Sequence, residues 1–185
     1  MNYKISEDSI WLAGANVVPS PNCDPRPLNV DIDLLIIHGI SLPPKEYGGG
    51  YIDKFFTNTL DPDEHPYFMK IKELRVSSHL LIDRQGRVTQ YVPFDMRAWH
   101  AGESSFNGRN NCNDYSIGVE LEGCDDEEYC DNQYIVLANI TKLICKRWQK
   151  IKKDRIVAHS DVAPDRKTDP GPFFDMNYYF SLLKT

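Results

Sequence analysis

A proline-rich segment near the end of the chain brings together an imidazole, an amine and a carboxylate. Residues 159–172, HSDVAPDRKTDPGP, contain His159, Lys167 and Asp169 among three prolines. Proline fixes φ and disrupts helices, so we expect a stiff loop that holds these side chains at low entropic cost. Because imidazole nitrogen and carboxylate oxygen are ordinary zinc ligands, the loop supplies two candidate ligands, and a third must come from elsewhere.

A short apolar run that ends in a histidine supplies that third candidate. Residues 34–38, LLIIH, predict a buried strand with His38 at its carboxyl end, where α/β sheets place ligand sites. With His159 and Asp169 it would give three protein ligands and leave a fourth position for water, the arrangement of catalytic zinc. The residue types alone also fit a strand-end histidine and a loop aspartate without a metal, since the chain contains no HExxH motif.

A strand with two glutamates on one face supplies a candidate general base. Residues 116–123, SIGVELEG, alternate in polarity. Because successive side chains of a strand point to opposite faces, Gly118, Glu120 and Glu122 share one face. That face could simply meet solvent, as in many antiparallel sheets. However, Gly118 leaves room for another group to approach, so we predict that Glu120 activates a water or protonates a departing amine.

Lys167 and Trp99 are candidates for contact with a substrate. Lys167 lies two residues from Asp169, which places both on one side of an extended loop, and an ammonium there would stabilise a developing oxyanion. Without further context, its charged neighbours favour a solvated surface lysine. Trp99, beside His100, offers a large flat apolar face for a sugar or a peptide.

The two glutamates of the strand also permit a different class of enzyme. Glu120 and Glu122 would lie about 6.6–6.8 Å apart as strand residues i and i+2, within loose reach of the carboxylate spacing in glycosidases. A glycosidase would release new reducing ends and would work in the presence of a chelator.

The remaining pattern predicts an α/β fold with one domain over residues 1–185. Apolar or alternating runs predict strands at 34–38, 116–123 and 156–158, and a hairpin from 78–83 and 88–93 around a glycine-containing turn. Helices are expected at 51–58, 67–74, 131–150 and 178–183. Four prolines between residues 19 and 27 predict an irregular arm over residues 1–30, and residues 95–113 are expected to be a loop.

Charge and cysteine content narrow the classes of function. The chain of 185 residues has a formal net charge of −6, which argues against nucleic acid or an anionic membrane as a partner. Five cysteines without a C-x-x-C pair predict reduced thiols. The polar start and the lack of a membrane-length apolar run then predict a cytoplasmic protein, which we expect to be a monomer.

Six blocks of the sequence together resemble a known enzyme family. They cover residues 34–44, 75–79, 90–95, 97–102, 112–123 and 163–172 in order. They are similar to the zinc-dependent N-acetylmuramoyl-L-alanine amidases of the type that includes phage T7 lysozyme and the peptidoglycan-recognition proteins. The nearest branch is the cytosolic one that acts on 1,6-anhydro-muramoyl peptides. The resemblance implies a central mixed β-sheet flanked by helices, with a zinc cleft on one face.

The resemblance also implies roles for individual residues. His38, His159 and Asp169 match the zinc ligands, and an aspartate as the third ligand is typical of the nearest branch. Glu120 matches the catalytic glutamate and Lys167 the catalytic lysine. Positions that line the substrate cleft are matched by Arg75, Trp99 and Ala163. The implied reaction, in cytosolic peptidoglycan recycling, is hydrolysis of the amide between (1,6-anhydro-)N-acetylmuramic acid and the L-alanine of the stem peptide.

Two positions depart from the nearest branch. Gly39 stands where asparagine is expected, and Asn111 stands where arginine is expected, so Arg109 is the candidate replacement. Because a muropeptide is anionic and the chain is acidic, we expect local positive charge from Arg75, Arg97 or Arg109 at the cleft.

The same fold could also serve a non-catalytic peptidoglycan-binding module. Such a module needs the cleft but not the metal ligands, so it would carry no stoichiometric zinc. The presence of all three ligand types, the glutamate and the lysine favours the enzyme.

Overall fold

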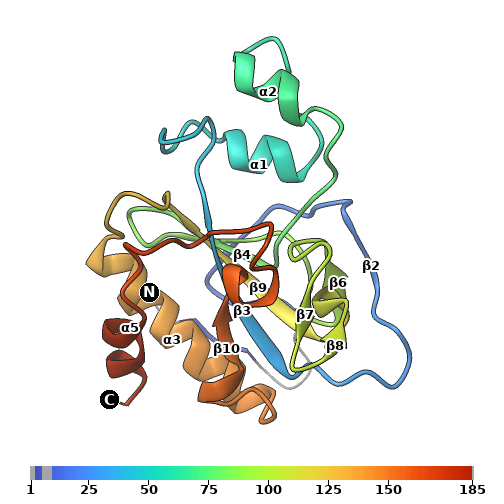
Figure 1. The fold of residues 1–185 in the computed structure, drawn as a ribbon, viewed down its shortest axis with the longest axis vertical. Coiled ribbons are helices and arrows are strands. Elements are labelled where there is room, and N and C mark those ends of the chain that lie inside the picture. Colours follow the sequence, from blue (N-terminus) through green and yellow to red (C-terminus); the bar gives the residue numbers. More distant parts are fainter. Residues whose placement is uncertain (1–2, 6–9, 185) are drawn as a thin grey trace.

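The computed structural model describes residues 3–5 and 10–184, and its centre is a six-stranded mixed sheet (Figure 1). The strand order is β1 (Asn16–Val17), β5 (Val88–Gln90), β4 (Leu80–Ile82), β9 (Ser116–Glu122), β3 (Leu34–Ile40) and β10 (Ile156–Ala158). Neighbouring strands are parallel except β4 and β5, which form the predicted antiparallel hairpin. The predicted α/β fold with a central mixed sheet is confirmed.

The two longest strands, β3 and β9, are buried on both faces. The first five residues of β3 and all seven residues of β9 are shielded from solvent. Parallel strands that are covered on both sides are usually continuous apolar runs, as the LLII of β3 is. β9 instead places Gly118, Glu120 and Glu122 on one buried face. That face therefore does not meet solvent, and its polar groups need another explanation.

Helices and apolar clusters cover the two faces of the sheet. On one face, α3 (Asp131–Arg147) and α5 (Met176–Leu183) pack in a core that includes the apolar face of β9. The other face meets two separate clusters. One contains α1 (Tyr51–Phe56) and α2 (Pro66–Ile71), which lie above the sheet in Figure 1, and the other contains Val162 of the one-turn helix α4 (His159–Val162). Along β3, His38 lies between Ile36 of the second cluster and Ile40 beside the first.

The predicted helices are confirmed, with ends that differ by a few residues. α3 ends at Arg147 rather than at residue 150, and α1 and α2 each end earlier than expected. α5 begins at Met176 because the Asp175 side chain accepts the Tyr178 N–H (2.9 Å) and caps the helix there.

Short strands occur in both segments that were predicted to be irregular. The arm over residues 1–30 contributes β1 and β2 (Cys23–Pro25), and β2 pairs antiparallel with β6 (Met96–Ala98). The segment 95–113 also contains β7 (Ser105–Phe106), β8 (Arg109–Asn110) and the start of a 3-10 turn, Cys112–Asp114. A second 3-10 turn, Lys153–Arg155, precedes β10. The partners of β1 and β2 are distant in sequence, so local composition could not indicate the pairing.

The predictions for two histidine positions need correction. His159 is not in a loop, because it is the first residue of α4; the prolines of its segment lie beyond the end of this helix and do not prevent it. His38 is not the last residue of its strand, because β3 continues to Ile40 through pairing with β9.

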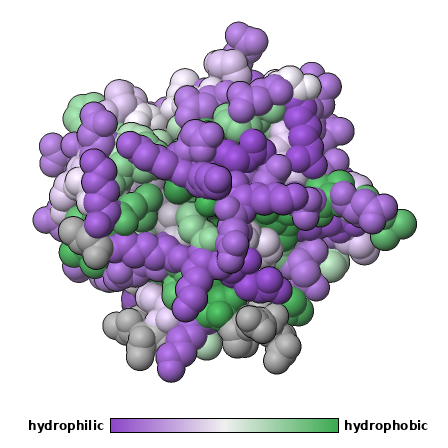
Figure 2. Space-filling view, turned by 90° about the horizontal axis from the view of Figure 1, so that it is seen from below, coloured by the Kyte–Doolittle hydropathy of each residue, from purple (hydrophilic) through white to green (hydrophobic). Residues whose placement is uncertain are grey.

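The surface and the cysteines agree with the sequence. Within the described residues, none of the helices has the length and apolar character needed to cross a membrane. Seen from below, the molecule is mostly hydrophilic, with separate hydrophobic areas between the polar side chains (Figure 2). All five cysteines lie in the described ranges and are free thiols, as predicted.

Candidate metal centre and active site

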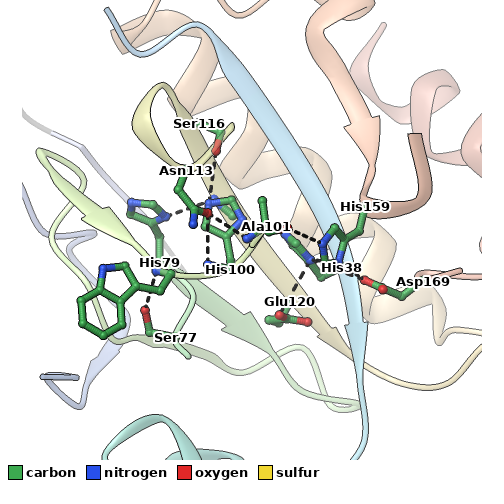
Figure 3. A network of polar contacts seen from close by, with 12 residues as sticks. His38, Ser77, His79, His100, Ala101, Asn113, Ser116, Glu120, His159 and Asp169 are labelled. Carbon is green, nitrogen blue, oxygen red and sulfur yellow. Dashed lines mark hydrogen bonds and ion pairs between the residues drawn. The ribbon is translucent and has the colours of Figure 1, made fainter. Parts of the chain in front are cut away.

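Parallel strand pairing brings the three predicted metal ligands together. Ile37 of β3 pairs with Ala158 of β10, so His159, the next residue, comes beside His38. The Ser160 N–H donates to the Asp169 carbonyl (3.1 Å), which returns the loop to the start of α4. The Nδ1 atoms of His38 and His159 lie 2.9 Å apart, and Asp169 Oδ2 lies 3.4 Å and 3.0 Å from them (Figure 3).

The second nitrogen of each imidazole contacts a partner of its own. His159 Nε2 lies 3.3 Å from the Ala101 carbonyl, which can only accept, so Nε2 carries the hydrogen. His38 Nε2 lies 2.9 Å from His100 Nδ1. Burial, and then the neighbouring His159, lowers the pKa of His38 to about 4, so His38 is neutral near pH 7. A His159 and a His38 that each carry hydrogen only on Nε2 would both present Nδ1 lone pairs toward Asp169.

Three electron-pair donors in such close contact fit a cation. With lone pairs on both Nδ1 atoms, no hydrogen lies between them or between them and an ionised Asp169, so the three groups repel one another. In a tetrahedral zinc site with bonds of about 2.0–2.1 Å, ligand atoms lie about 3.3 Å from each other. The observed separations of 2.9, 3.0 and 3.4 Å are close to this value. Two nitrogens and one oxygen are also an established zinc donor set. The site therefore fits zinc.

Glu120 is directly opposite His38 in the register of β9 and β3. Its Oε1 lies 4.0 Å from His38 Nδ1, and its Oε2 is buried without a hydrogen-bond partner among the described residues. Burial, and then the Asp169 carboxylate, raises the pKa of Glu120 well above its usual range, while Lys167 opposes this. A cation at the metal centre would favour the ionised form that a general base requires.

These residues line one end of a cavity of about 680 Å³. Lys167 also faces it, and so it joins the metal ligands and Glu120 as the sequence predicted. The apolar part of the lining comes from the segments around α1 and α2, namely Leu42, Pro44, Phe55, Phe56, Tyr67, Ile71, Leu74 and Val76. A cavity of this size, apolar with a few convergent polar groups, is typical of a small-molecule site.

The structure does not bring the four predicted substrate contacts to this cavity, whose lining among the described residues leaves them out. Arg75 donates to the carbonyls of Lys72 and Leu74 and lines a small neighbouring hollow. Trp99 Nε1 donates to Asp24 (3.1 Å). Ala163 is buried beside α4, where its N–H donates to the His159 carbonyl.

The described residues that line the cavity include no arginine, and the expected positive charge from Arg97 and Arg109 stays a prediction. Arg97 forms ion pairs with Asp24 and Asp114. Arg109 pairs with Asp33 (3.3 Å) and lies over the Tyr115 ring, 3.7 Å from its centre. The cations that line the cavity are Lys45 and Lys167. Asn111 itself has φ 58°, a conformation that asparagine adopts more readily than arginine.

Glu122 is not available as a second catalytic carboxylate. It is buried, and its two oxygens accept the backbone N–H groups of Gly48 (2.5 Å) and Arg84 (3.2 Å). These bonds hold the loop before α1 and the hairpin turn, away from the metal ligands. The glycosidase alternative, which needs both glutamates, therefore loses one of them.

The departure at Gly39 has a structural reason. A Cβ atom at this position would collide with the hydroxyl of Tyr129, which donates to the Pro170 carbonyl (3.0 Å). The ring of Tyr129 also fills the space that a side chain at Gly123 would need. Tyr129 thus occupies the volume into which an asparagine at position 39 would project.

Gly39→Asn is expected to lower the free energy of unfolding by about 1–3 kcal/mol, because the new side chain overpacks a buried contact. Urea denaturation of Gly39→Asn, Tyr129→Phe and the double variant measures this. The loss in the double variant should be smaller than the sum of the single losses, since removal of the hydroxyl makes room. Additive losses would show that the two positions do not compete for space.

His79 and His100 were not predicted as metal ligands or catalytic residues, and they extend the polar network along β9. Burial lowers the pKa of both imidazoles well below the ordinary value, so both are neutral. His79 Nδ1 accepts the Gly118 N–H (3.0 Å), and its Nε2 donates to the Met96 carbonyl (3.1 Å). The ring of His100 lies directly over Gly118. The room that Gly118 was predicted to leave is therefore filled by this imidazole.

Comparison with known proteins identifies relatives over nearly the whole chain. A family model described as N-acetylmuramoyl-L-alanine amidase matches residues 28–172. The 1,6-anhydro-N-acetylmuramyl-L-alanine amidase AmpD of Haemophilus influenzae is 53% identical over 173 residues, which cover 94% of each chain. The crystal structure of a selenomethionine derivative of AmpD superposes with a TM-score of 0.93 at 52% identity, over 97% of this chain and 99% of the other.

A more distant structure shows a relative with a ligand. The Escherichia coli amidase AmiD, in complex with the substrate anhydro-N-acetylmuramic acid-L-Ala-D-γ-Glu-L-Lys, has a TM-score of 0.60 and 27% identity. The match covers 97% of this chain and 65% of AmiD.

Proposed function

The chain belongs to the N-acetylmuramoyl-L-alanine amidase family, and from that premise we propose that His38, His159 and Asp169 hold a catalytic zinc ion beside the base Glu120. The protein is an enzyme of peptidoglycan recycling. It hydrolyses the amide between 1,6-anhydro-N-acetylmuramic acid and the L-alanine of the stem peptide.

The observation that carries the residue assignment is the convergence of three electron-pair donors at a buried point. Two imidazoles and one carboxylate present their donor atoms within 3.4 Å of one another, and the buried Glu120 stands next to them. A bound zinc ion would supply a Lewis acid there, which lowers the pKa of a water and polarises a carbonyl. The free thiols of the chain are not among the ligands.

Glu120 has the position and the environment of a general base. Its unpartnered Oε2 is free to accept the proton of the attacking water. Glu120 would then return that proton to the nitrogen of the departing L-alanine, so that the amide breaks into a carboxylic acid and a neutral amine; transfer of the acid proton to the amine then gives a carboxylate and an ammonium group. Burial holds the carboxyl in a place where this proton exchange does not compete with bulk solvent.

Lys167 would stabilise the negative charge that develops on the carbonyl oxygen. It lies on the cavity wall with the ligands, and it is half-buried, so its charge is weakly screened. The apolar wall beside α1 and α2 would contact the less polar parts of the muropeptide. Because AmiD binds an anhydromuramoyl tripeptide, we propose a ligand of the same class for this cavity.

The alternative of a non-catalytic binding module has no support in the site. Such a module has no use for a buried glutamate with a free oxygen beside three metal-ligand atoms. These groups carry a desolvation cost that a simple binding surface avoids.

Mass spectrometry of the products tests the proposed function. We expect anhydro-N-acetylmuramic acid and free peptide from an anhydromuramoyl tripeptide, no product with a chelator, and recovery after zinc is added back. Unchanged turnover in the chelator would contradict the metal assignment. Products in which the amide is intact would contradict the activity.

The organisation of the protein is a further part of the proposal. We propose one amidase domain over residues 1–185, because the arm contributes β1 to the central sheet and β2 to a second, two-stranded sheet. We also propose that the protein is a monomer and that it is cytoplasmic. The five free thiols agree with the reducing environment of the cytoplasm. Size-exclusion chromatography with light scattering tests whether the protein is a monomer, and cell fractionation tests whether it is cytoplasmic.

A further inference from the structure

We propose that His100 is a positioning residue that fixes the tautomer of His38 and so keeps the Nδ1 lone pair of His38 directed at the metal centre. This inference rests on the proposed zinc site and adds a residue to it. His100 does not itself reach the metal ligand cluster, and it acts only through its contact with His38.

A chain of hydrogen bonds determines the direction of that contact. The Ser116 hydroxyl lies 2.6 Å from the Cys112 carbonyl, which can only accept, so the hydroxyl donates its one hydrogen there. Toward His100 Nε2, 3.2 Å away, Ser116 Oγ must then accept, and Nε2 must carry the hydrogen. Neutral His100 therefore has a lone pair on Nδ1. It accepts from His38 Nε2, 2.9 Å away, and Nδ1 of His38 is left without hydrogen.

The opposite tautomer of His100 would remove the lone pair that His38 needs to bind a metal. If His100 carried its hydrogen on Nδ1, His38 Nε2 would have to accept. Neutral His38 would then carry its hydrogen on Nδ1, between His159 and Asp169, where a metal ligand needs a lone pair. The Cys112 carbonyl thus sets the state of His38 through two intermediate side chains. Partners of this kind, beyond the direct ligands, orient metal-bound histidines in proteins.

The surrounding structure holds the ring of His100 in place. A Cβ atom at Gly118 would lie 2.6 Å from the ring, so only glycine allows the imidazole to reach β3 across β9. The Asn113 side chain accepts the backbone N–H groups of His100 and Ala101 (3.2 and 2.8 Å). Ala101 in turn accepts from His159 Nε2. One short segment therefore supplies the partners of both imidazole ligands (Figure 3).

A matched pair of variants tests the inference by zinc affinity. Asparagine and leucine have similar size and branching, but only asparagine can place an acceptor near the position of Nδ1. In competition with a chromogenic chelator, His100→Leu is expected to weaken zinc binding by about 10–100-fold. His100→Asn should keep most of the affinity. Equal affinities for the two variants would overturn the proposal, because a packing role would affect both alike.

The wild-type protein gives a second test that does not depend on the folding of a variant. In two-bond ¹H–¹⁵N spectra of the zinc-loaded protein, His100 should carry hydrogen on Nε2 and none on Nδ1. Hydrogen on Nδ1 of His100 would overturn the proposal. His38→Ala serves as the reference. If it binds zinc as the wild type does, the metal site itself is wrong; if it loses zinc while His100→Leu does not, only the role of His100 fails.

Discussion

Glu120→Gln is expected to lower amidase turnover by about 10²–10⁴-fold and to leave the zinc content unchanged. Glutamine keeps the size and one carbonyl oxygen of the side chain, but it cannot take a proton from water. The stability should not fall, because a neutral amide replaces a carboxyl whose burial disfavours its charged form. Steady-state rates on an anhydromuramoyl tripeptide, with metal analysis of the same sample, measure both quantities.

Glu122→Gln is the matched control for this experiment. It makes the same chemical change two residues along β9, on the same face, but its oxygens accept backbone N–H groups outside the cavity. We expect a loss of stability with little loss of turnover per folded molecule. If Glu122→Gln were as inactive as Glu120→Gln, or if Glu120→Gln were fully active with zinc bound, Glu120 would not be the base.

Removal of a metal ligand should have the other large effect. In Asp169→Ala, zinc affinity is expected to fall on the order of 10²-fold or more, since loss of an outer partner alone costs 10–100-fold. Turnover should fall with it, because the site keeps only two protein ligands. Dialysis against zinc buffered at a fixed free concentration, followed by metal analysis, measures the affinity.

Asp126→Asn provides the control for charge. Asp126 also lines the cavity, where it pairs with Lys45 at the surface. Its substitution removes a negative charge from the same cavity without touching a ligand, so zinc should be retained. Equal loss of zinc in both variants would mean that the total negative charge of the cavity holds the metal, rather than coordination by Asp169.

The proposed metal ligands and the proposed base could be predicted from the sequence because each stands where a simple pattern changes. His38 ends an apolar run, and Glu120 breaks an otherwise apolar strand. Parallel pairing of β3 with β9 and β10 then places His38 beside Glu120 and His159. The order of the six sequence blocks made the fold predictable, since together they constrain the whole sheet.

The other features depend on contacts between residues far apart in the chain. His100 meets His38 across 62 positions of sequence, so its place in the site follows only from the fold. The surroundings of the expected cleft arginines also follow only from the fold, because Asp24 and Asp114 bind Arg97, and Asp33 binds Arg109. The sequence shows that Gly39 departs from the nearest branch, but not why. The reason is the side chain of Tyr129, from the loop before α3, which fills the space that a side chain at position 39 would need.

X-ray absorption at the zinc edge tests the central assignment most directly. For the zinc-loaded protein we expect one ion per chain, a first shell of nitrogen and oxygen at about 2.0–2.1 Å, and outer-shell scattering from two imidazole rings. Sulfur at about 2.3 Å, which would indicate a cysteine ligand, would contradict the account. So would a spectrum without imidazole, or a protein that retains less than one ion after dialysis.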